Sequence, residues 1–331
     1  MTRTVTLDAW LARHFADQAF TYAPASADAS FRRYFRVERP GCAPLIVMDA
    51  PPEHEDCRPF VKVARLFAAT GVHVPEVLAE DLDNGYLLLS DLGSTTYLQA
   101  IDPGNAAALY GEATDALVRI QTASQDGVLP TYDRELLLRE LRLFPDWYIA
   151  RHLRVELTPA QREVLDRSFE AILQNNLAQP RVYVHRDYHS RNLMVAHPGP
   201  GILDFQDAVY GPITYDLVSL FKDAYVSWEE ELVLDWTVRY WQKARKAGLP
   251  LDHDFHAFYR DFEWMGVQRH IKVLGIFARL FHRDGKSGYL DDMPLVMRYL
   301  RKACQRYDAL HPLLRLLDQL EPQPARAGYT F

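Results

Sequence analysis

A polar loop enclosed by short apolar strands constrains the fold of this chain more than any other feature. Residues 181–211 read RVYVHRDYHSRNLMVAHPGPGILDFQDAVYG, where VYV and GILDF have the composition of buried strands and PGPG that of a turn. Long stretches on both sides of this segment instead carry the spacing of amphipathic helices. A chain that combines strands with long helices in this way is expected to adopt an α+β fold.

The loop concentrates side chains that handle protons and metal ions. His185, Arg186 and Asp187 come first, Asn192 follows five residues after the Asp, and the next strand ends in Asp204-Phe205. This order matches the H-R-D-x-x-x-x-N loop and the D-F pair of the kinase signature. The chemistry needs a carboxylate to accept the proton of an attacking hydroxyl, and an amide oxygen with a second carboxylate to hold Mg²⁺ against phosphate oxygens. The segment therefore predicts phosphoryl transfer, with Asp187 as the base.

A hydrolase-type metal centre is the alternative interpretation of the same loop. His185, Asp187 and His189 alternate and could chelate a metal ion if His197 and Asp204 added further ligands. Nothing else in the chain reproduces a hydrolase constellation, so phosphoryl transfer is favoured. His185 is then predicted to be a packed residue that organises the loop.

The first part of the chain predicts a small α+β unit. The opening residues have Leu7, Trp10 and Leu11 at helical spacing, and FRRYFRV and PLIVMDA read as the two strands of a hairpin. A helix with one apolar face is predicted within residues 55–70, and a second hairpin is predicted around Asn84-Gly85, between VPEVLAED and YLLLSDLG. We expect residues 1–92 to form the N-terminal nucleotide-binding lobe.

The patterns beyond residue 93 are mostly helical, and residues 93–331 are predicted to form the larger catalytic and substrate-binding lobe. The predicted helices span 106–122, 133–151, 159–174, 228–247, 254–282 and 291–309. Residues 321–331 are predicted to be a loosely held terminus.

Composition excludes several classes of protein. The 331 residues carry a formal net charge of −7 and no run of five or more Lys and Arg, which argues against nucleic acid as a partner. Cys42, Cys57 and Cys304 are odd in number and lack metal-ligand spacing, as expected in a reducing compartment. No apolar stretch approaches the roughly 20 residues that cross a bilayer, so we expect a cytoplasmic protein that does not bind membranes. The oligomeric state has no signal in the sequence.

Two segments carry a family resemblance. VHRDYHSRNLMV and ILDFQDAVYGPITYDL resemble the aminoglycoside phosphotransferase family, and the likeness extends over about residues 25–225. The resemblance implies a bilobal protein-kinase-like fold that uses ATP and Mg²⁺. It implies that Asp187 is the catalytic base, that Asn192 and Asp204 are the Mg²⁺ ligands, that Leu89, Ser90 and Asp91 form the hinge beside the adenine, and that Asp216 braces the catalytic loop.

Further segments resemble one branch of that family. SFRRYFRV, VMDAPPE, LLLSDLG and QRHIKVLGIFARL are similar to the bacterial anomeric kinases of cell-wall recycling. Those enzymes phosphorylate N-acetylmuramate and N-acetylglucosamine at the 1-hydroxyl. The resemblance implies a sugar as the acceptor; a kinase of another hydroxylated metabolite, of the aminoglycoside, choline or homoserine type, remains the alternative.

The chain departs from the kinase pattern at two places. Ser30, Arg32 and Arg33 stand where a glycine-rich phosphate loop would be, and they are predicted to contact phosphate, although exposed strand residues would look the same. Met48 or Asp49 stands where a kinase strand carries Lys. The missing Lys leaves a nucleotide-binding pseudokinase as an alternative to an enzyme, which the intact base and metal ligands favour.

The acceptor site is predicted from the last long helix and from the loop after Asp204. Gln268, Arg269 and Lys272 interrupt the apolar pattern of that helix and are suited to a carboxylate-bearing sugar, although a solvated helix face would give the same pattern. Asp207 and Tyr210 are added because they follow Asp204 closely.

Overall fold

The computed structural model describes residues 3–16, 18–27 and 31–321. Contacts divide the chain into two compact units, residues 1–123 with 191–208 and residues 124–190 with 209–331. The predicted boundary after residue 92 separates a nucleotide-binding lobe from a catalytic and substrate-binding lobe. The two compact units do not test that functional division, so it stays a prediction. Ser30 and the tail from residue 322 lie outside the described residues.

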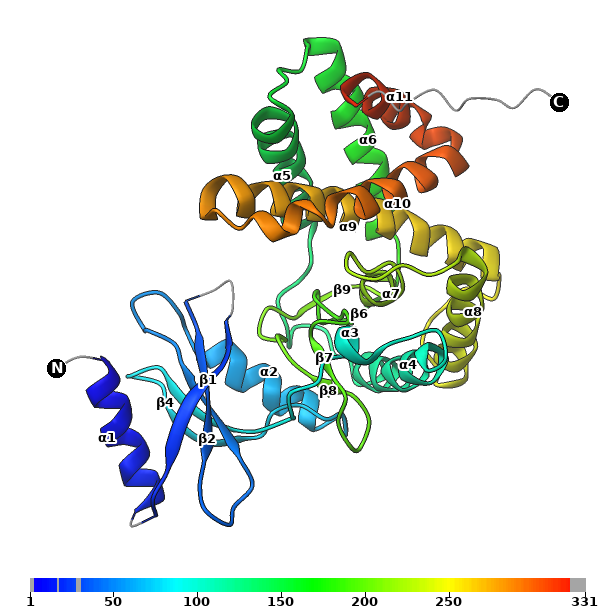
Figure 1. Cartoon of the computed structure of the whole chain (residues 1–331). Coiled ribbons are helices and arrows are strands. Elements are labelled where there is room, and N and C mark those ends of the chain that lie inside the picture. The colour runs from blue at the N-terminus through cyan, green and yellow to red at the C-terminus, as the bar shows by residue number, and fades with distance from the viewer. Residues whose placement is uncertain (1–2, 17, 28–30, 322–331) are drawn as a thin grey trace. The chain divides into compact units, whose positions relative to one another are not determined.

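A five-stranded antiparallel sheet forms the centre of the first unit (Figure 1). Its strands, in the order β1-β2-β3-β5-β4, are β1 (Thr21–Ala27), β2 (Arg33–Glu38), β3 (Leu45–Asp49), β5 (Tyr86–Ser90) and β4 (Val77–Asp81). Both predicted hairpins are confirmed. Gly85 makes the second turn possible, because its φ is 72° and a Cβ would stand 1.8 Å from the carbonyl oxygen of Ala50. Strand β1 was not predicted, since its small residues resemble a turn.

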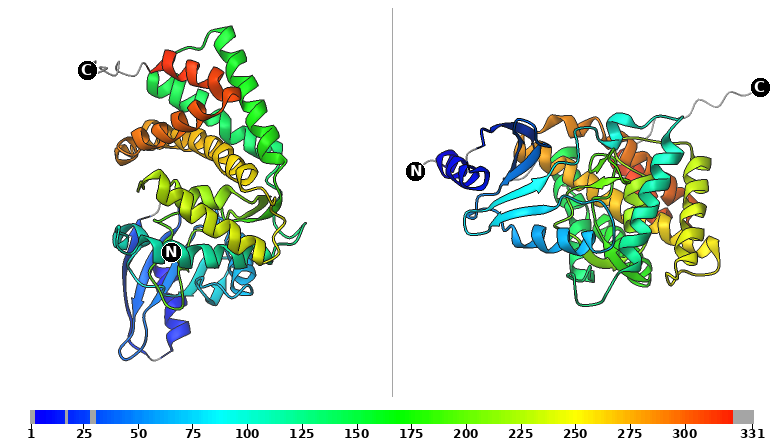
Figure 2. Two further views of the ribbon diagram at one scale, coloured as in Figure 1. Left: turned by 90° about the vertical axis from the view of Figure 1, so that its right-hand side faces the viewer. Right: turned by 90° about the horizontal axis from the view of Figure 1, so that it is seen from below.

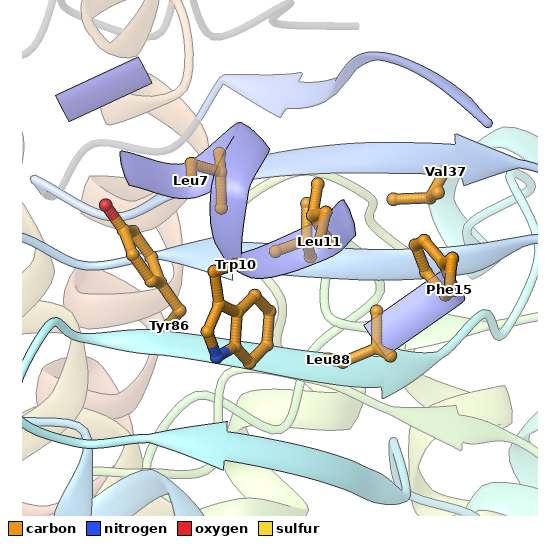
Figure 3. Close-up of a cluster of buried hydrophobic side chains, with 8 residues drawn as sticks. Leu7, Trp10, Leu11, Phe15, Val37, Tyr86 and Leu88 are labelled. Atoms are coloured by element: carbon orange, nitrogen blue, oxygen red, sulfur yellow. The ribbon is translucent and has the colours of Figure 1, made fainter. Parts of the chain in front are cut away.

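Helix α1 (Arg3–Phe15) covers one face of this sheet. Its apolar stripe packs on strand residues in a buried cluster (Figure 3): Leu7, Trp10, Leu11 and Phe15 from the helix, and Val37, Val47, Tyr86 and Leu88 from the sheet. A fully buried side chain of this kind contributes about 1.5–3 kcal/mol. The first helix is therefore an integral part of the sheet's hydrophobic core.

The opposite face of the sheet presents the alternate residues of each strand. Tyr34 and Arg36 of β2, Ile46 of β3 and Leu89 of β5 lie on this face, since successive strand side chains point to opposite sides. Helix α2 (Arg58–Ala68) has the predicted spacing of buried residues at Phe60, Val63, Ala64 and Phe67. The first unit also contains α3 (Tyr97–Ala100), α4 (Ala106–Thr122) and the hairpin β7 (Leu193–Met194) and β8 (Gly201–Ile202).

The second unit is mostly helical around one two-stranded sheet. Strands β6 (Arg181–Val184) and β9 (Val209–Pro212) pair antiparallel. The helices are α5 (Arg134–Leu143), the π-helix η1 (Phe144–Leu153), α6 (Pro159–Leu177), α7 (Tyr215–Phe221), α8 (Glu230–Lys246), α9 (Phe255–Asp284), α10 (Met293–Arg306) and α11 (His311–Leu320), with short 3₁₀ turns at Ser287–Leu290 and Asp308–Leu310. The α+β class is confirmed.

Helix α9 is the longest element and contacts most of its unit. Figures 1 and 2 show α10 beside it, and α5, α7 and η1 also pack on it. A Cβ on Gly275 would lie 2.5 Å from the backbone carbonyl carbon of Leu143 at the end of α5. The two helices reach this separation because position 275 has no side chain.

The predicted helices agree with the structure apart from their ends. The helix predicted over 133–151 is α5 followed by η1, a change of helix type at Phe144-Pro145, where proline lacks the amide hydrogen of a regular turn. Helices α7 and α11 were not predicted. The predicted strand GILDF is only two residues long and pairs with β7. No helix in the described part of the chain is long and apolar enough to span a lipid bilayer.

Candidate active site

A cavity of about 450 Å³ lies within the first unit. Five of the predicted residues line it together: Leu89, Ser90, Asp91, Asn192 and Asp204. Strands β1, β2 and β3 supply other walls, together with Phe205. Its volume lies in the range of ligand sites, about 300–1,000 Å³, so the structure brings the predicted hinge and the predicted metal ligands to one cavity.

Asn192 and Asp204 are neighbours in this cavity. Asn192 Nδ2 lies 3.4 Å from Asp204 Oδ2, and the backbone amide of Leu203 donates to the Asn192 carbonyl at 2.9 Å. Phe205, which follows Asp204, is buried with its ring 4.9 Å from that of Phe60 and 6.1 Å from that of Phe67. An amide oxygen and a carboxylate are hard oxygen donors that suit Mg²⁺, and rotation of the Asn192 amide presents its oxygen. The residue types therefore fit the expected ion.

The predicted hinge is held by reciprocal hydrogen bonds. The Ser90 amide donates to the Glu76 carbonyl at 3.0 Å, and the Glu76 amide donates to Ser90 Oγ at 2.9 Å. Asp91 accepts from Arg36 Nε at 2.6 Å and from Arg36 Nη2 at 3.0 Å. This bidentate pair ties the hinge to β2. Arg36 was missed, although its strand alternation with Tyr34 places it on the cavity face.

Arg32 and Arg33 point to different partners. Arg32 Nη2 lies 3.8 Å from Asp204 Oδ1, whereas Arg33 forms an ion pair with Asp49 on the α1 side of the sheet. Asp49 is fully buried and also accepts from Arg3 Nε at 2.6 Å. Asp49 is thus an anchor for α1, and Ile46 is the β3 residue that lines the cavity. A phosphate role stays a prediction for both arginines, and geometry favours Arg32.

The predicted catalytic loop, in the second unit, is fixed by a buried carboxylate. Asp216 accepts from the backbone amides of His185 at 2.7 Å and Arg186 at 2.9 Å. Burial raises the pKa of Asp216 to about 7 against the opposing effect of these two hydrogen bonds. His185 is fully buried and its Nδ1 accepts from the Asp187 amide at 3.2 Å. The predicted brace and the predicted packed histidine are confirmed.

The metal-centre interpretation of the loop finds no ligand cluster. Within residues 3–16, 18–27 and 31–321, no three His, Cys, Asp or Glu side chains are grouped so that they could hold a metal ion. His189 instead packs its ring at 5.5 Å from the ring of Tyr225.

Asp187 lies in a strongly positive environment. Burial by itself would raise the pKa of this carboxyl, but the charges of Lys272, His189 and Arg269 outweigh burial and lower the pKa to about 2. Asp187 is therefore ionised at neutral pH and can accept a hydrogen bond and a proton.

Glu140 of α5 is a buried residue that sequence reasoning missed. One of its oxygens binds Arg186 of the catalytic loop and Lys272 of α9, the latter at 3.1 Å, and the other accepts from the Tyr132 hydroxyl. Lys272 Nζ also donates to the Tyr215 hydroxyl at 2.9 Å. Burial would raise the pKa of Glu140, but the charges of Lys272 and Arg186 lower it. Glu140 therefore links the catalytic loop to α9.

A second cavity, of about 130 Å³, lies within the second unit. It is lined by Asp187, His189, Tyr215, Ala224, Tyr225, Arg269, Lys272, Val273, Ile276, Phe277, Leu280 and Tyr289. Arg269 and Lys272 are buried, so a solvated helix face is excluded for them. Gln268 is buried as well, but its Nε2 donates to the Leu137 carbonyl at 3.0 Å and it does not line the cavity.

The other two substrate candidates lie elsewhere. Asp207 is exposed in the first unit, where Gln206 contacts it, and Tyr210 lies in β9, where its backbone bonds to Pro130 and Tyr132. Neither residue lines the two cavities described above. A substrate role for them stays a prediction without support from the geometry.

Sequence comparisons relate this chain to phosphotransferases and to sugar kinases. The sequence profile described as "Phosphotransferase enzyme family" matches residues 21–255. An N-acetylmuramate/N-acetylglucosamine kinase of Pseudomonas aeruginosa is 57% identical over 92% of this chain and 89% of its own length, and one of Neisseria meningitidis is 50% identical over 100% of both chains.

Solved structures share the fold at low sequence identity. Wild-type aminoglycoside 2'-phosphotransferase-IIIa in its GDP complex is 13% identical with a TM-score of 0.62, covering 92% of this chain and 100% of that chain. A choline/ethanolamine kinase family protein from Mesorhizobium loti is 13% identical with a TM-score of 0.58, covering 96% of this chain and 100% of that chain.

Proposed function

Because this chain belongs to the phosphotransferase enzyme family, we propose that it is a kinase that transfers the terminal phosphoryl group of ATP to N-acetylmuramate and N-acetylglucosamine. The observation that carries the proposal is the pair of kinases of these two sugars that are 57% and 50% identical over nearly the whole chain. The family resemblance read from the sequence is thereby confirmed. The protein-kinase-like fold is shared with the solved phosphotransferases.

The acceptor is the anomeric 1-hydroxyl, and the product belongs to peptidoglycan recycling. The segments that resemble anomeric sugar kinases support this choice of hydroxyl. Use of ATP and the three unpaired cysteines support a cytoplasmic location, since thiols stay reduced there.

The cavity of the first unit suits the nucleotide. Leu89, Ser90 and Asp91 would contact the adenine, and Asn192 with Asp204 would hold Mg²⁺. When bound, Mg²⁺ offsets the negative charge of the phosphate oxygens. The backbone on either side of this pair is anchored, because the Leu203 amide donates to the backbone carbonyl of Asn192 and the buried ring of Phe205, the residue after Asp204, packs against Phe60.

Arg32 would replace the strand Lys that this chain lacks. Its Nη2 lies 3.8 Å from Asp204 Oδ1, and a guanidinium can bind two phosphate oxygens at once. Arg33 is unsuited to this role because Asp49 holds it on the other face of the sheet.

Asp187 orients the acceptor hydroxyl and takes up its proton. With a pKa of about 2 it is a weak base, so its main contribution is to hold the hydroxyl in line for attack until the new bond has largely formed. Asp216 fixes the backbone of the loop that carries it, and Glu140 fixes Arg186 beside it.

Phosphoryl transfer to a panel of acceptors tests this function. Purified protein with Mg-ATP is given N-acetylmuramate, N-acetylglucosamine, glucose, choline or kanamycin, and ADP release and the phosphorus NMR spectrum of the product are recorded. We expect a sugar 1-phosphate from the two N-acetyl sugars only. Phosphorylation of choline or kanamycin alone, or ATP binding without any transfer, would contradict the proposal.

Two variants separate catalysis from folding. Asp187→Asn should lower kcat by about 10²–10⁴-fold, the usual contribution of a general base, and leave ATP binding unchanged. Asp166→Asn makes the same change at an exposed position of α6 and should leave kcat unaltered. Equal activities of the two variants would refute the role of Asp187.

A further inference from the structure

Arg269 is a buried cation with open hydrogen-bonding capacity. Arg269 is only 3% exposed, and its Nε and Nη1 have no hydrogen-bond partner among residues 3–16, 18–27 and 31–321. A guanidinium carries five N–H donors, and buried donors are normally paired because an unpaired one is costly. Arg269 therefore has the properties of a residue that completes its bonds with a ligand.

Arg269 lies on the face of α9 that lines the second cavity, the one of about 130 Å³. The cavity residues of this helix follow the spacing of one helical face: Arg269, Lys272, Val273, Ile276, Phe277 and Leu280. The charged residues come first in the chain and the apolar ones follow. The cavity thus has a polar end that also contains Asp187 and an apolar end.

Lys272 is paired with a carboxylate, whereas Nε and Nη1 of Arg269 have no hydrogen-bond partner in the described part of the chain. Lys272 Nζ binds Glu140 at 3.1 Å and Tyr215 at 2.9 Å. Arg186 binds the same Glu140. Arg186, Lys272 and Arg269 share this part of the unit with three carboxyl groups, Glu140, Asp187 and Asp216, and Asp216 accepts from two backbone amides. Within the described residues, Nε and Nη1 of Arg269 have no hydrogen-bond partner, so these two donors are open to a further anion.

The apolar end of the cavity suits the remainder of an N-acetyl sugar. The rings of Tyr225 and Phe277 lie 6.2 Å apart, and those of Phe277 and Tyr289 lie 5.0 Å apart. Such rings pack against the methyl group of an acetyl substituent and the C–H groups of a sugar. A volume of about 130 Å³ holds a substituent rather than a single water molecule.

We propose that Arg269 binds the carboxylate of N-acetylmuramate and so determines how well the enzyme uses an anionic sugar relative to a neutral one. This inference rests on the proposed function. N-acetylglucosamine has no carboxylate, so its phosphorylation does not need this contact. Lys272 and Gln268, which the sequence grouped with Arg269, instead support the structure of the site.

The first test compares the two sugars in one variant. Arg269→Gln should lower kcat/KM for N-acetylmuramate by about 10- to 100-fold, the range for a lost charged hydrogen bond, and that for N-acetylglucosamine by less than about 3-fold. Arg269→Lys should lie between wild type and Arg269→Gln. Arg260→Gln removes the same charge from an exposed position of α9 and should change neither sugar.

The second test removes the charge from the ligand instead. The methyl ester of N-acetylmuramate should be a poorer substrate than the acid for wild type, and the two should be equal for Arg269→Gln, because the cycle isolates the interaction between the two charges. The ratio of the activities on the acid and the ester, measured in one preparation, does not depend on the fraction of the protein that is folded.

Two different results would contradict the role of Arg269 and the proposed function, respectively. An equal loss for both sugars in Arg269→Gln would overturn the inference and assign Arg269 to the chemical step. A wild-type protein that phosphorylates neither N-acetyl sugar would overturn the proposed function itself.

Discussion

Replacing Glu140 by Gln should destabilise the second unit more than any exposed charge change can. Glu140 is 5% exposed and its two oxygens accept from Arg186, Lys272 and Tyr132. Gln has nearly the same shape but no charge, so two cations that are largely shielded from water lose their shared anion.

The magnitude follows from the burial of these partners. Removing one member of a buried ion pair costs about 3–5 kcal/mol, and because Gln keeps one acceptor oxygen we expect the lower end, about 3 kcal/mol. For chains of a few hundred residues each kcal/mol lowers the thermal midpoint by roughly 2–4 °C, so the shift should be about 6–12 °C. Glu170→Gln breaks an exposed ion pair with Arg134 and should leave the midpoint unchanged.

Thermal unfolding followed by circular dichroism between pH 3 and 8 measures the effect. The folded-state pKa of Glu140 is lowered, so its contribution is present above its unfolded pKa of about 4.3 and is lost as the pH falls through the folded value. The difference between wild type and Glu140→Gln should therefore shrink in acid. A midpoint equal to that of Glu170→Gln at pH 7 would refute the reasoning.

Three further changes test other parts of the structure. Leu11→Ala removes a fully buried side chain of α1 from its contact with the sheet and should cost about 3 kcal/mol in urea unfolding while the KM for ATP is unchanged; a loss below about 1 kcal/mol would mean that α1 is not part of the core. Burial raises the pKa of Asp216 to about 7, so the stability that its proton supplies is full below pH 4 and declines as the pH rises toward 7. The urea midpoint of Asp216→Asn should lack this decline, and parallel pH profiles for the variant and wild type would contradict the assignment. Arg36→Gln releases Asp91 from its bidentate partner and should raise the KM for ATP about 10-fold, measured by ADP release; an unchanged KM would separate this pair from nucleotide binding.

Local patterns allowed much of the fold to be predicted. The period of apolar residues located α1, α2, α4, α6, α8, α9 and α10, and the Asn84-Gly85 pair located a hairpin, because these signals depend on near neighbours in the chain. Strand β1 was missed because a run of small residues has no clear period. The π-helix η1 was missed because a change of helix type within one apolar pattern leaves its spacing almost unaltered.

Within the site, too, the residues of a local sequence pattern could be predicted and those brought together by packing could not. Asp187, Asn192 and Asp204 could be named because the loop that carries them is a short, ordered pattern. Glu140 could not be, since its partners Arg186 and Lys272 are 46 and 132 positions away and only the packing of α5 and α9 brings them together. The distinct partners of Arg32 and Arg33 likewise depend on where β2 begins, since Arg33 is its first residue and Arg32 lies just before it, and the register of a strand is set by its neighbours.

The close approach at Gly275 has a consequence for how acceptor preference can change. Gly275 lies on the side of α9 toward Leu143, whereas the cavity residues lie on a different face of the same helix. A methyl group at this position would push α9 away from α5, and the whole cavity face would move with it. Substitutions that never touch the sugar can therefore resize the pocket, which offers evolution, or a laboratory selection, a remote route to new acceptors.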